Sequence, residues 1–213
     1  MDRFIAFEGI EGCGKTTQIR MAGEYLATQG LVCLTTDEPG GTPLGKIIRE
    51  TLLNIGSYAI SPRAELLLFV AARVQHVQDV IMPALEQGKW VICDRFIDAT
   101  IAYQGFGRGL DLEVIKNLHD FSSAALTPDL TILLDMPVEE GLRRALNRIA
   151  RLHGVDREDR FEREELAFHQ RVREGYLSLA GKHPERYRII DGARELAAVH
   201  KDVCHELLTF MKR

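Results

Sequence analysis

A glycine-rich run near the start of the chain carries side chains suited to holding the phosphates of a nucleotide. The run has the pattern Gly-x-x-x-x-Gly-Lys-Thr, from Gly9 to Thr16. Glycines in this pattern let backbone N–H groups turn toward phosphate oxygens. Lys15 would reach the β- and γ-phosphates, and the Thr16 hydroxyl would hold Mg²⁺. The expected ATP-binding residues are Gly9, Ile10, Glu11, Gly12, Cys13, Gly14, Lys15 and Thr16.

The flanks of this run decide whether it is a phosphate-binding loop or a turn that binds nothing. Residues 4–7 are apolar and predict a buried strand, and residues 15–29 are helix-prone. A strand, a glycine loop and a helix are the context that the motif requires. The helix N-terminus also favours an anion. We therefore favour a phosphate-binding loop.

Two acids follow apolar runs that predict buried strands. Asp94 follows residues 90–93 and precedes Arg95, and Asp135 follows residues 130–134. An acid at such a strand end can orient Mg²⁺ directly or through water. An adjacent arginine can bridge phosphates and stabilise developing charge. We rank Asp94 first because Arg95 adjoins it; Asp135 could instead cap the next helix, and a strand-end ion pair is the alternative for Asp94 and Arg95.

Residues 62–87 have the spacing of a long helix, which Pro83 should kink or interrupt. Arg73 lies one turn after Phe69 on the apolar stripe of this helix. Two interpretations stay open. Arg73 could extend its head to solvent at the edge of the core, or it could grip a ligand whose base stacks on Phe69.

Two other segments offer side chains for the same ligand. Glu38 and Pro39 lie in a loop after the strand predicted at residues 31–35, at the sheet edge where ligands bind in such folds. Thr100, Tyr103 and Gln104 share one face of a predicted helix and could contact a base and a sugar, or form a polar surface stripe. Residues 105–109, which contain three glycines, predict a flexible loop.

An arginine-rich stretch at residues 143–163 is a candidate lid. It carries seven arginines interleaved with acids, and Gly154 interrupts its helical pattern. A solvated charged face is the usual explanation. In a phosphoryl-transfer enzyme, such a segment could close over the triphosphate and add positive charge. The lid candidates are Arg148, Arg151 and Arg157.

Five short apolar runs alternate with helical patterns and predict an α/β fold with a parallel sheet covered by helices on both faces. The strands are expected at residues 4–7, 31–35, 90–93, 130–134 and 187–190. The stretches 164–180 and 195–210 predict two structural amphipathic helices. No repeat or linker interrupts the pattern, so residues 1–213 are expected to form a single three-layer P-loop domain.

The composition narrows the functional classes. The net charge is −4, so no global positive field favours nucleic acid or a membrane surface. No apolar run approaches the roughly 20 residues that span a bilayer, and the early strand leaves no room for a signal peptide. Four scattered cysteines and seven histidines show no metal-ligand spacing. We expect a cytoplasmic protein without a structural metal.

In combination, these segments resemble bacterial thymidylate kinases over nearly the whole chain. The resemblance rests on the order and spacing of several motifs, since each alone would be modest evidence. They are the P-loop at 9–16, Glu-Pro-Gly-Gly-Thr at 38–42, Phe-Val-Ala-Ala-Arg at 69–73, Asp-Arg-Phe at 94–96, Ala-Tyr-Gln-Gly at 102–105, Pro-Asp-Leu-Thr at 128–131, and the acids and arginines of 156–162.

The resemblance implies a role for each matching residue. Phe69 would stack on thymine, Arg73 would hydrogen-bond the base edge, and Thr100 and Gln104 would lie against the base. Arg95 would grip the dTMP phosphate. Tyr103 would crowd the sugar 2′ position, and Glu11 would meet the 3′-hydroxyl. The implied dTMP site is Glu11, Glu38, Pro39, Phe69, Arg73, Arg95, Thr100, Tyr103 and Gln104, and the candidate Mg²⁺ ligands are Thr16, Asp94 and Glu162.

Three positions distinguish this chain within the family pattern. Some members carry an arginine in the P-loop where this chain has Gly12, so this chain resembles the type in which lid arginines supply the charge. Asp37 replaces the usual arginine before Glu-Pro-Gly-Gly and reverses a charge near the monophosphate end. Phe96 replaces the usual tyrosine or histidine. Family members are typically homodimers, with the helix around Phe69 near the interface.

The expected function is a Mg²⁺-dependent kinase that moves the γ-phosphoryl group of ATP to dTMP, making dTDP for dTTP supply. The expected catalytic residues are Lys15, Asp94, Arg95, Arg148, Arg151 and Arg157. A kinase for dUMP or UMP is the nearest alternative, which the base-site residues should exclude. A regulatory module that binds nucleotide without transferring phosphate is the alternative from another class.

Overall fold

Five parallel strands form one sheet in the order β2-β3-β1-β4-β5. The computed structural model describes residues 3–53, 59–123, 125–151 and 160–212. Asp37 and Asp94 pair in register at the ends of β2 and β3, so both carboxylates reach the same sheet edge. The strands are β1 (Phe4–Glu8), β2 (Cys33–Asp37), β3 (Trp90–Asp94), β4 (Leu130–Asp135) and β5 (Tyr187–Asp191).

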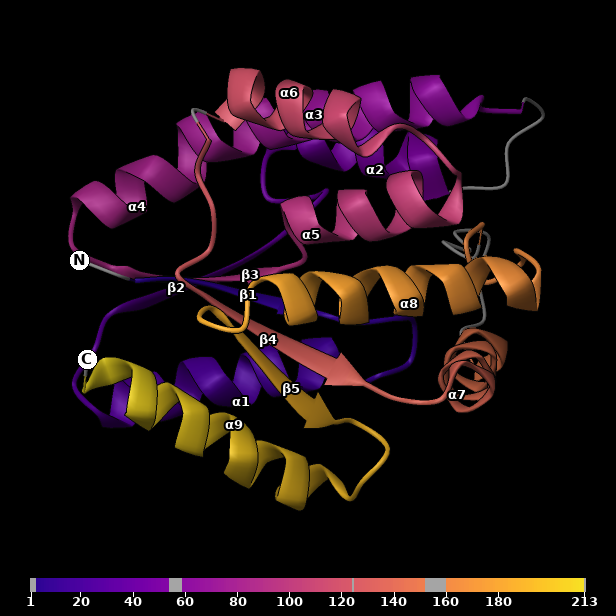
Figure 1. Cartoon of the computed structure of the whole chain (residues 1–213). Helices are drawn as coiled ribbons and strands as arrows, with labels where there is room; N and C mark the ends of the chain where they lie inside the picture. The colour runs from indigo at the N-terminus through magenta and orange to yellow at the C-terminus, as the bar shows by residue number, and fades with distance from the viewer. Residues whose placement is uncertain (1–2, 54–58, 124, 152–159, 213) are drawn as a thin grey trace.

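Helices cover both faces of this sheet (Figure 1). Helices α1 and α9 lie on one face; α4, α5 and α8 lie on the other, with α2, α3 and α6 stacked beyond them. The helices are α1 (Lys15–Thr28), α2 (Pro43–Leu53), α3 (Pro62–His76), α4 (Met82–Glu86), α5 (Ile97–Thr100), α6 (Leu112–Ser123), α7 (Val138–Arg151), α8 (Leu166–Lys182) and α9 (Leu196–Met211).

The central strand β1 is buried on both sides. Ile5 and Phe7 pack into one apolar cluster, and Phe4 and Ala6 pack into another. Successive side chains of a strand point to opposite faces, so each face has its own core. This confirms the prediction of a parallel sheet covered on both sides.

Of two helical segments compared with the sequence expectations, one agrees and the other differs. The long helix predicted at residues 62–87 changes to a π-helical turn at Val77–Ile81, just before Pro83, as a break near that proline predicts. The prediction of a flexible loop at 105–109 is wrong for its first residues, because a π-helical segment continues from Ile101 to Gly107. A Cβ on Gly107 would lie 2.6 Å from the Phe168 ring. This glycine therefore permits close packing of α8 rather than flexibility.

The candidate lid is only partly described. Helix α7 covers its first part, and the described chain resumes at Arg160. Arg157 and Gly154 lie outside the described residues.

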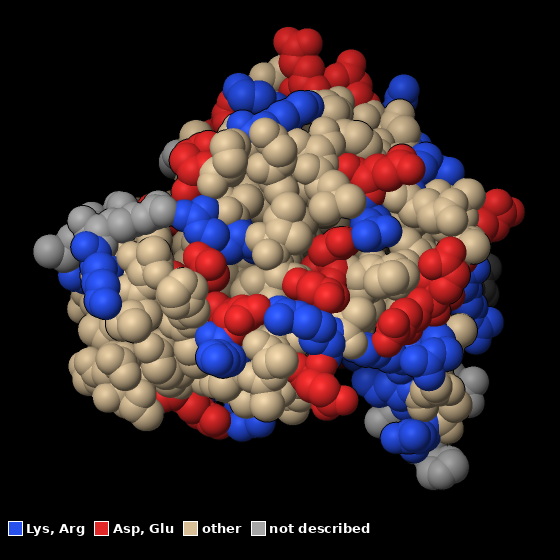
Figure 2. All heavy atoms as spheres, turned by 60° about the horizontal axis from the view of Figure 1, so that its bottom comes forward, with Lys and Arg blue, Asp and Glu red and all other residues tan. Residues whose placement is uncertain are grey.

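Figure 2 shows positive and negative side chains interspersed over most of the face that it presents, in keeping with the small net charge. Among the described residues, no helix has the length and apolar character needed to cross a membrane.

Candidate active site

A cavity of about 200 Å³ opens at the carboxyl ends of β1, β2 and β3, the edge at which the sequence predicts a ligand site. It extends from the P-loop past β3 to α3 and the segment after α5. Most of the predicted site residues line it. They are Glu11, Gly12, Lys15, Thr16, Glu38, Pro39, Phe69, Arg73, Asp94, Arg95, Thr100, Tyr103, Gln104, Arg148 and Glu162.

The P-loop supplies the phosphate-binding end of the cavity. Lys15 Nζ is buried and donates to the carbonyl oxygens of Gly9 (3.1 Å) and Ile10 (3.0 Å). The Thr16 hydroxyl donates to Asp94 Oδ2 at 3.2 Å. The hydroxyl and the carboxylate expected to serve Mg²⁺ are therefore adjacent.

Asp135, the competing acid, is engaged elsewhere. Its two oxygens accept bonds from Arg173 Nε (2.7 Å) and Nη2 (2.8 Å). This bidentate pair joins the end of β4 to α8, a structural ion pair. The geometry favours Asp94 over Asp135 at the phosphate site.

The position of Gly12 leaves no room for a side chain. Its φ is +72°, and a Cβ on it would lie 2.0 Å from the carbonyl oxygen of Gly141 in α7. An arginine at this position would therefore require both the loop and α7 to move. The lid arginines therefore remain the predicted source of the charge that a P-loop arginine supplies in other members of the pattern.

Arg73 is fully buried, which excludes the interpretation that it extends its head to solvent. Its side chain is 1% exposed; Nε donates to Glu38 Oε1 at 2.6 Å, and Nη2 donates to Thr100 Oγ1 at 2.7 Å. The guanidinium also lies over the Phe96 ring, 5.2 Å from its centroid. The remaining nitrogen, Nη1, is buried without a hydrogen-bond partner.

Arg95 has a left-handed backbone conformation, with φ 69°, at the mouth of the P-loop. Strained residues of this kind persist where surrounding contacts fix them. Its Nη1 donates to the Tyr176 hydroxyl (2.9 Å) and its Nη2 to Glu11 Oε1 (3.2 Å). Its guanidinium lies 4.8 Å from the Tyr103 ring centroid. These contacts hold the arginine between the P-loop and the ring of Tyr103.

Beneath Arg95 lies Glu8, a fully buried acid at the end of β1. One oxygen accepts from the Phe96 backbone N–H (2.8 Å), and the other bonds the Tyr176 hydroxyl (2.8 Å). Burial, reinforced by Asp98, raises the pKa of Glu8 to about 8. This carboxyl therefore holds its proton at neutral pH and supports the turn that presents Arg95.

Glu11 of the P-loop is ionised despite burial. Desolvation alone would raise its pKa, but His169, Arg95 and Lys15 lower it to about 2. His169 Nδ1 lies 3.3 Å from Glu11 Oε2, and the Tyr103 hydroxyl donates to Glu11 Oε1. Glu11 is thus a fixed negative acceptor in the middle of the cavity.

Aromatic rings form the wall opposite the P-loop. Phe69 and Phe161 have centroids 6.4 Å apart, and Tyr103 meets Phe161 edge to face at 5.5 Å. Gln104 lies beside them and is fully buried. This combination can sandwich a flat ring and contact its polar edge.

The described lid residues reach the cavity in part. Arg148 lines it and lies 3.7 Å from Glu162, whose pKa is raised by burial and by Glu11. Arg151, the last residue of α7, is exposed and lies outside the lining. Arg160 is anchored away from the phosphate end, on Glu65 of α3.

Several lining residues are not named in the sequence expectations, and Arg49 and Phe161 are the two with charged or aromatic side chains. Arg49 of α2 pairs with Asp37 at 3.3 Å and donates to the Pro39 carbonyl at 2.9 Å. Arg49 therefore places a positive charge beside Asp37, the acid that stands where the family pattern has an arginine. Phe161 is the other residue, and its hydrophobic side chain within a charged stretch is the signal that could have identified it.

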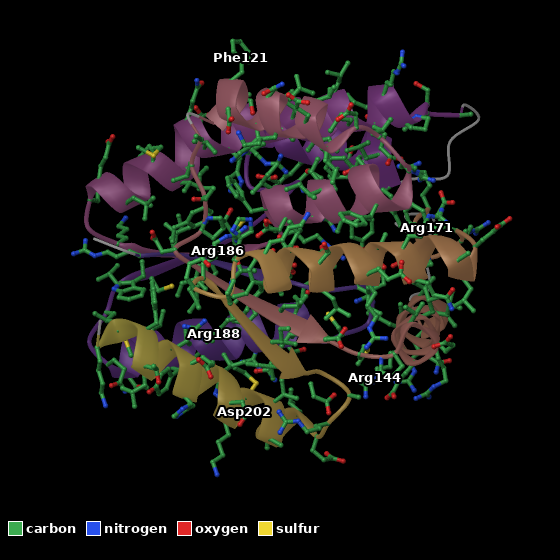
Figure 3. The ribbon with its side chains drawn as sticks, viewed as in Figure 1. Phe121, Arg144, Arg171, Arg186, Arg188 and Asp202 are labelled. Atoms are coloured by element: carbon green, nitrogen blue, oxygen red, sulfur yellow. The ribbon has the colours of Figure 1, made fainter. Side chains whose placement is uncertain are left out.

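A second cavity of about 290 Å³ lies on the other side of the P-loop, against Cys13 and Gly14. Arg144 of α7 borders it and is held by bonds to the carbonyl oxygens of Gly192 (3.1 Å) and Ala193 (3.0 Å). Figure 3 shows Arg144 between α7 and the loop that follows β5. Since it adjoins the P-loop, this cavity can hold another part of a nucleotide whose phosphates the loop binds.

The donor set near the P-loop suits Mg²⁺ bound partly by substrate. Within the described part of the chain, no group of three or more His, Cys, Asp or Glu side chains is placed to hold a metal ion. Mg²⁺ is commonly held by one or two carboxylates together with phosphates and water. The Thr16 hydroxyl and the Asp94 carboxylate fit that mode.

Comparison with known proteins identifies the family. The model of the thymidylate kinase family matches residues 7–203. The chain belongs to the thymidylate kinase family. It phosphorylates dTMP to dTDP and is therefore a nucleoside-monophosphate kinase.

Relatives at high identity support this assignment over the whole chain. The thymidylate kinase of Syntrophus aciditrophicus (strain SB) is 54% identical over 97% of this chain and 94% of its own length. That of Geobacter sulfurreducens is 52% identical over 100% of both. The crystal structure of thymidylate kinase from Ehrlichia chaffeensis has 35% identity and a TM-score of 0.77, covering 97% of this chain and 98% of that chain. The predicted P-loop α/β fold is thereby confirmed.

Proposed function

We propose that one cavity holds dTMP and the reacting phosphates of ATP, with Arg95 between the two, and that transfer proceeds directly in line. The observation that carries this is the placement of Arg95 between Lys15 of the P-loop and the aromatic wall around Phe69. In-line transfer requires positioning, charge neutralisation and exclusion of water, with no covalent intermediate on the protein.

The thymine base lies between Phe69 and the face formed by Thr100 and Gln104. The unpartnered Nη1 of Arg73 supports a hydrogen bond to a carbonyl at the base edge. Glu38 fixes the Arg73 head for this contact, and Pro39 closes the same side of the site.

The sugar and phosphate of dTMP follow toward the P-loop. Tyr103, fixed by its bond to Glu11, crowds the 2′ position and favours deoxyribose. Glu11 accepts from the 3′-hydroxyl, and Arg95 grips the phosphate. The bonds from Arg95 to Tyr176 and Glu11 support this placement because they aim the guanidinium before the substrate arrives.

ATP lies across the P-loop. Backbone N–H groups of residues 9–16 cradle its phosphates, and Lys15 turns from the Gly9 and Ile10 carbonyls to the β- and γ-phosphates. The adenine occupies the second cavity beside Arg144, whose position supports stacking on a flat base.

The chemistry that a bound Mg²⁺ would supply is neutralisation of the charge that develops during transfer. Thr16 and Asp94 would hold the ion, and Glu162 is a further candidate. Arg148 adds positive charge from the lid, and Arg151 and Arg157 are the other candidates for this role. The cavity lining supports the role of Arg148.

The chain acts as a single domain over residues 1–213, and it acts in the cytoplasm.

The protein forms a homodimer through α3 and α6. Exposed apolar side chains on these adjacent helices support the dimer: Leu67, Val114 and Phe121, the last of which is 89% exposed. Figure 3 shows Phe121 projecting outward from α6. Sedimentation of the protein and of Phe121→Glu tests this surface: the wild type should run as a dimer and the variant should dissociate more readily. A monomeric wild type would contradict it.

Variants at Lys15 and Arg95 test the assigned residues. Lys15→Ala and Arg95→Ala are expected to remove most turnover while the fold, followed by circular dichroism, survives. Near-normal turnover by either folded variant would contradict its role. Binding of dTMP without measurable transfer by the wild type would instead favour a regulatory module.

A further inference from the structure

The buried carboxylate of Glu65, which does not line the cavity, accepts a hydrogen bond from the side-chain amide of Gln104. Gln104 Nε2 donates to Glu65 Oε1 at 2.8 Å, and both side chains are almost completely buried. Glu65 also accepts from Arg108 Nε and Nη2 (3.2 Å each) and from Arg160 Nη2 (2.6 Å). Four N–H donors from three residues therefore converge on one acid of α3.

The charge of Glu65 determines which way the Gln104 amide faces. Burial would raise the pKa of Glu65, but hydrogen bonds from Arg108 and Gln104 lower it more, so the group is ionised. An ionised carboxylate can only accept hydrogen bonds. A reversed amide would set two oxygens against each other. The Nε2 atom must therefore face Glu65, which leaves the carbonyl oxygen of Gln104 as the amide atom available to a ligand.

Arg73 presents a hydrogen-bond donor on the same wall of the cavity, where Gln104 presents an acceptor. Glu38 and Thr100 occupy Nε and Nη2, and the buried Nη1 is a donor without a partner. The wall thus offers one acceptor and one donor. Thymine and uracil present the complement, an N3–H donor beside the O4 acceptor, whereas cytosine reverses both groups.

We propose that Glu65 is a positioning residue that sets the base selectivity of this site. By holding the Gln104 carbonyl toward the ligand, it favours pyrimidines with an N3–H beside a C4 carbonyl and disfavours aminopyrimidines. The proposal rests on the proposed function, because it places the base of dTMP against Gln104.

The test measures binding of three nucleotides to the wild type and to Glu65→Gln by calorimetry without ATP. Thymidine and 5-methyl-deoxycytidine monophosphates differ only at positions 3 and 4 of the ring, while dTMP and dUMP share that edge. A neutral amide at position 65 can donate as well as accept, so Gln104 can turn. We expect affinity for dTMP and dUMP to fall by roughly fivefold to tenfold, the size of one hydrogen bond, and affinity for 5-methyl-dCMP to hold or rise.

Glu164→Gln is the matched control. Glu164 pairs with Arg108 at 2.6 Å, so its variant disturbs the same cluster from the side away from Gln104. It should leave the preference for dTMP over 5-methyl-dCMP unchanged. If Glu65→Gln does not fold, Glu65→Asp is the second variant. It keeps the negative charge that faces Arg108 and Arg160 but shortens the reach of the carboxylate to Gln104. The preference for dTMP over 5-methyl-dCMP should still become smaller in this variant.

Two results would overturn the proposal. Equal loss of affinity for all three nucleotides in a folded Glu65 variant would mean that Glu65 only supports the structure. An unchanged preference would mean that Gln104 is oriented without it. A wild type that binds dTMP no better than 5-methyl-dCMP would instead overturn the placement of the base, before any variant is compared.

Discussion

Glu38→Gln removes the negative charge from a buried ion pair beside the cavity and should destabilise the fold markedly. The Arg73 and Glu38 side chains are 1% and 2% exposed, with a closest N–O distance of 2.5 Å. The substitution keeps the shape of the side chain and one acceptor oxygen. It leaves the Arg73 charge buried with neutral acceptors only, which are the glutamine oxygen, Thr100 and Phe96.

The expected cost follows from this geometry. Two unit charges about 4 Å apart attract by about 4 kcal/mol at an effective dielectric constant of about 20. Breaking a buried pair by removing one partner costs about 3–5 kcal/mol in mutational studies. Because the glutamine oxygen still accepts from Arg73, we expect a loss of about 3 kcal/mol in the free energy of unfolding. For a chain of this length, that corresponds to a fall of about 6–12 °C in Tm.

Urea unfolding and thermal melting of the wild type and Glu38→Gln measure this loss. The matched control is Glu24→Gln, which removes the acid of the exposed Arg20–Glu24 pair, 64% and 63% exposed. That change should cost less than about 1 kcal/mol. If Glu38→Gln costs no more than Glu24→Gln, the buried pair does not carry the stability assigned to it.

Three further predictions concern the phosphate end of the site. Asp94→Asn should raise the Mg²⁺ concentration needed for half-maximal turnover, whereas Asp135→Asn should leave it unchanged; a Mg²⁺ titration that moves equally in both would contradict the assignment of Asp94. Tyr176→Phe removes a hydrogen-bond partner of Arg95 and should raise the KM for dTMP by roughly tenfold at similar fold content, while an unchanged KM would show that Arg95 is aimed without it. Glu8 has its pKa raised from 4.5 to about 8, so the folded state holds a proton that the unfolded state loses, and stability from this group is lost as pH rises between those values. Between pH 5.5 and pH 8, the free energy of unfolding measured in urea should therefore fall less in Glu8→Gln than in the wild type. Equal falls would mean that Glu8 is not the group that binds this proton.

The sequence predicts the sheet well because buried parallel strands have near-continuous apolar residues. Four of the five strands begin at the predicted residue. Strand β2 is the exception: it runs from Cys33 to Asp37 rather than from 31 to 35. Its last residues, Thr36 and Asp37, are polar and join the sheet through pairing with Cys93 and Asp94 of β3. A local hydrophobic pattern cannot detect that pairing.

The candidate site was predictable where a motif fixes its spacing, as for Lys15, Thr16 and Arg95. The residues that orient them were not, because their partners are distant along the chain. Glu65 has the sequence appearance of an acid in the first turn of a helix, yet its partners Arg108 and Arg160 lie 43 and 95 residues away. In the sequence, Gly107 resembles a loop glycine. The packing of α8 against it, which leaves no room for a Cβ, is visible only in the structure.

The most direct test of the account is the acceptor dependence of ADP formation by the wild type with ATP and Mg²⁺. The acceptors are dTMP, dUMP, UMP, dCMP, AMP or none, with direct detection of the diphosphate product. The account predicts ADP formation that depends strongly on dTMP and yields dTDP in equal amount. ADP release that is indifferent to the acceptor would mean an ATPase or a switch, and it would contradict the base site built around Phe69, Arg73 and Gln104.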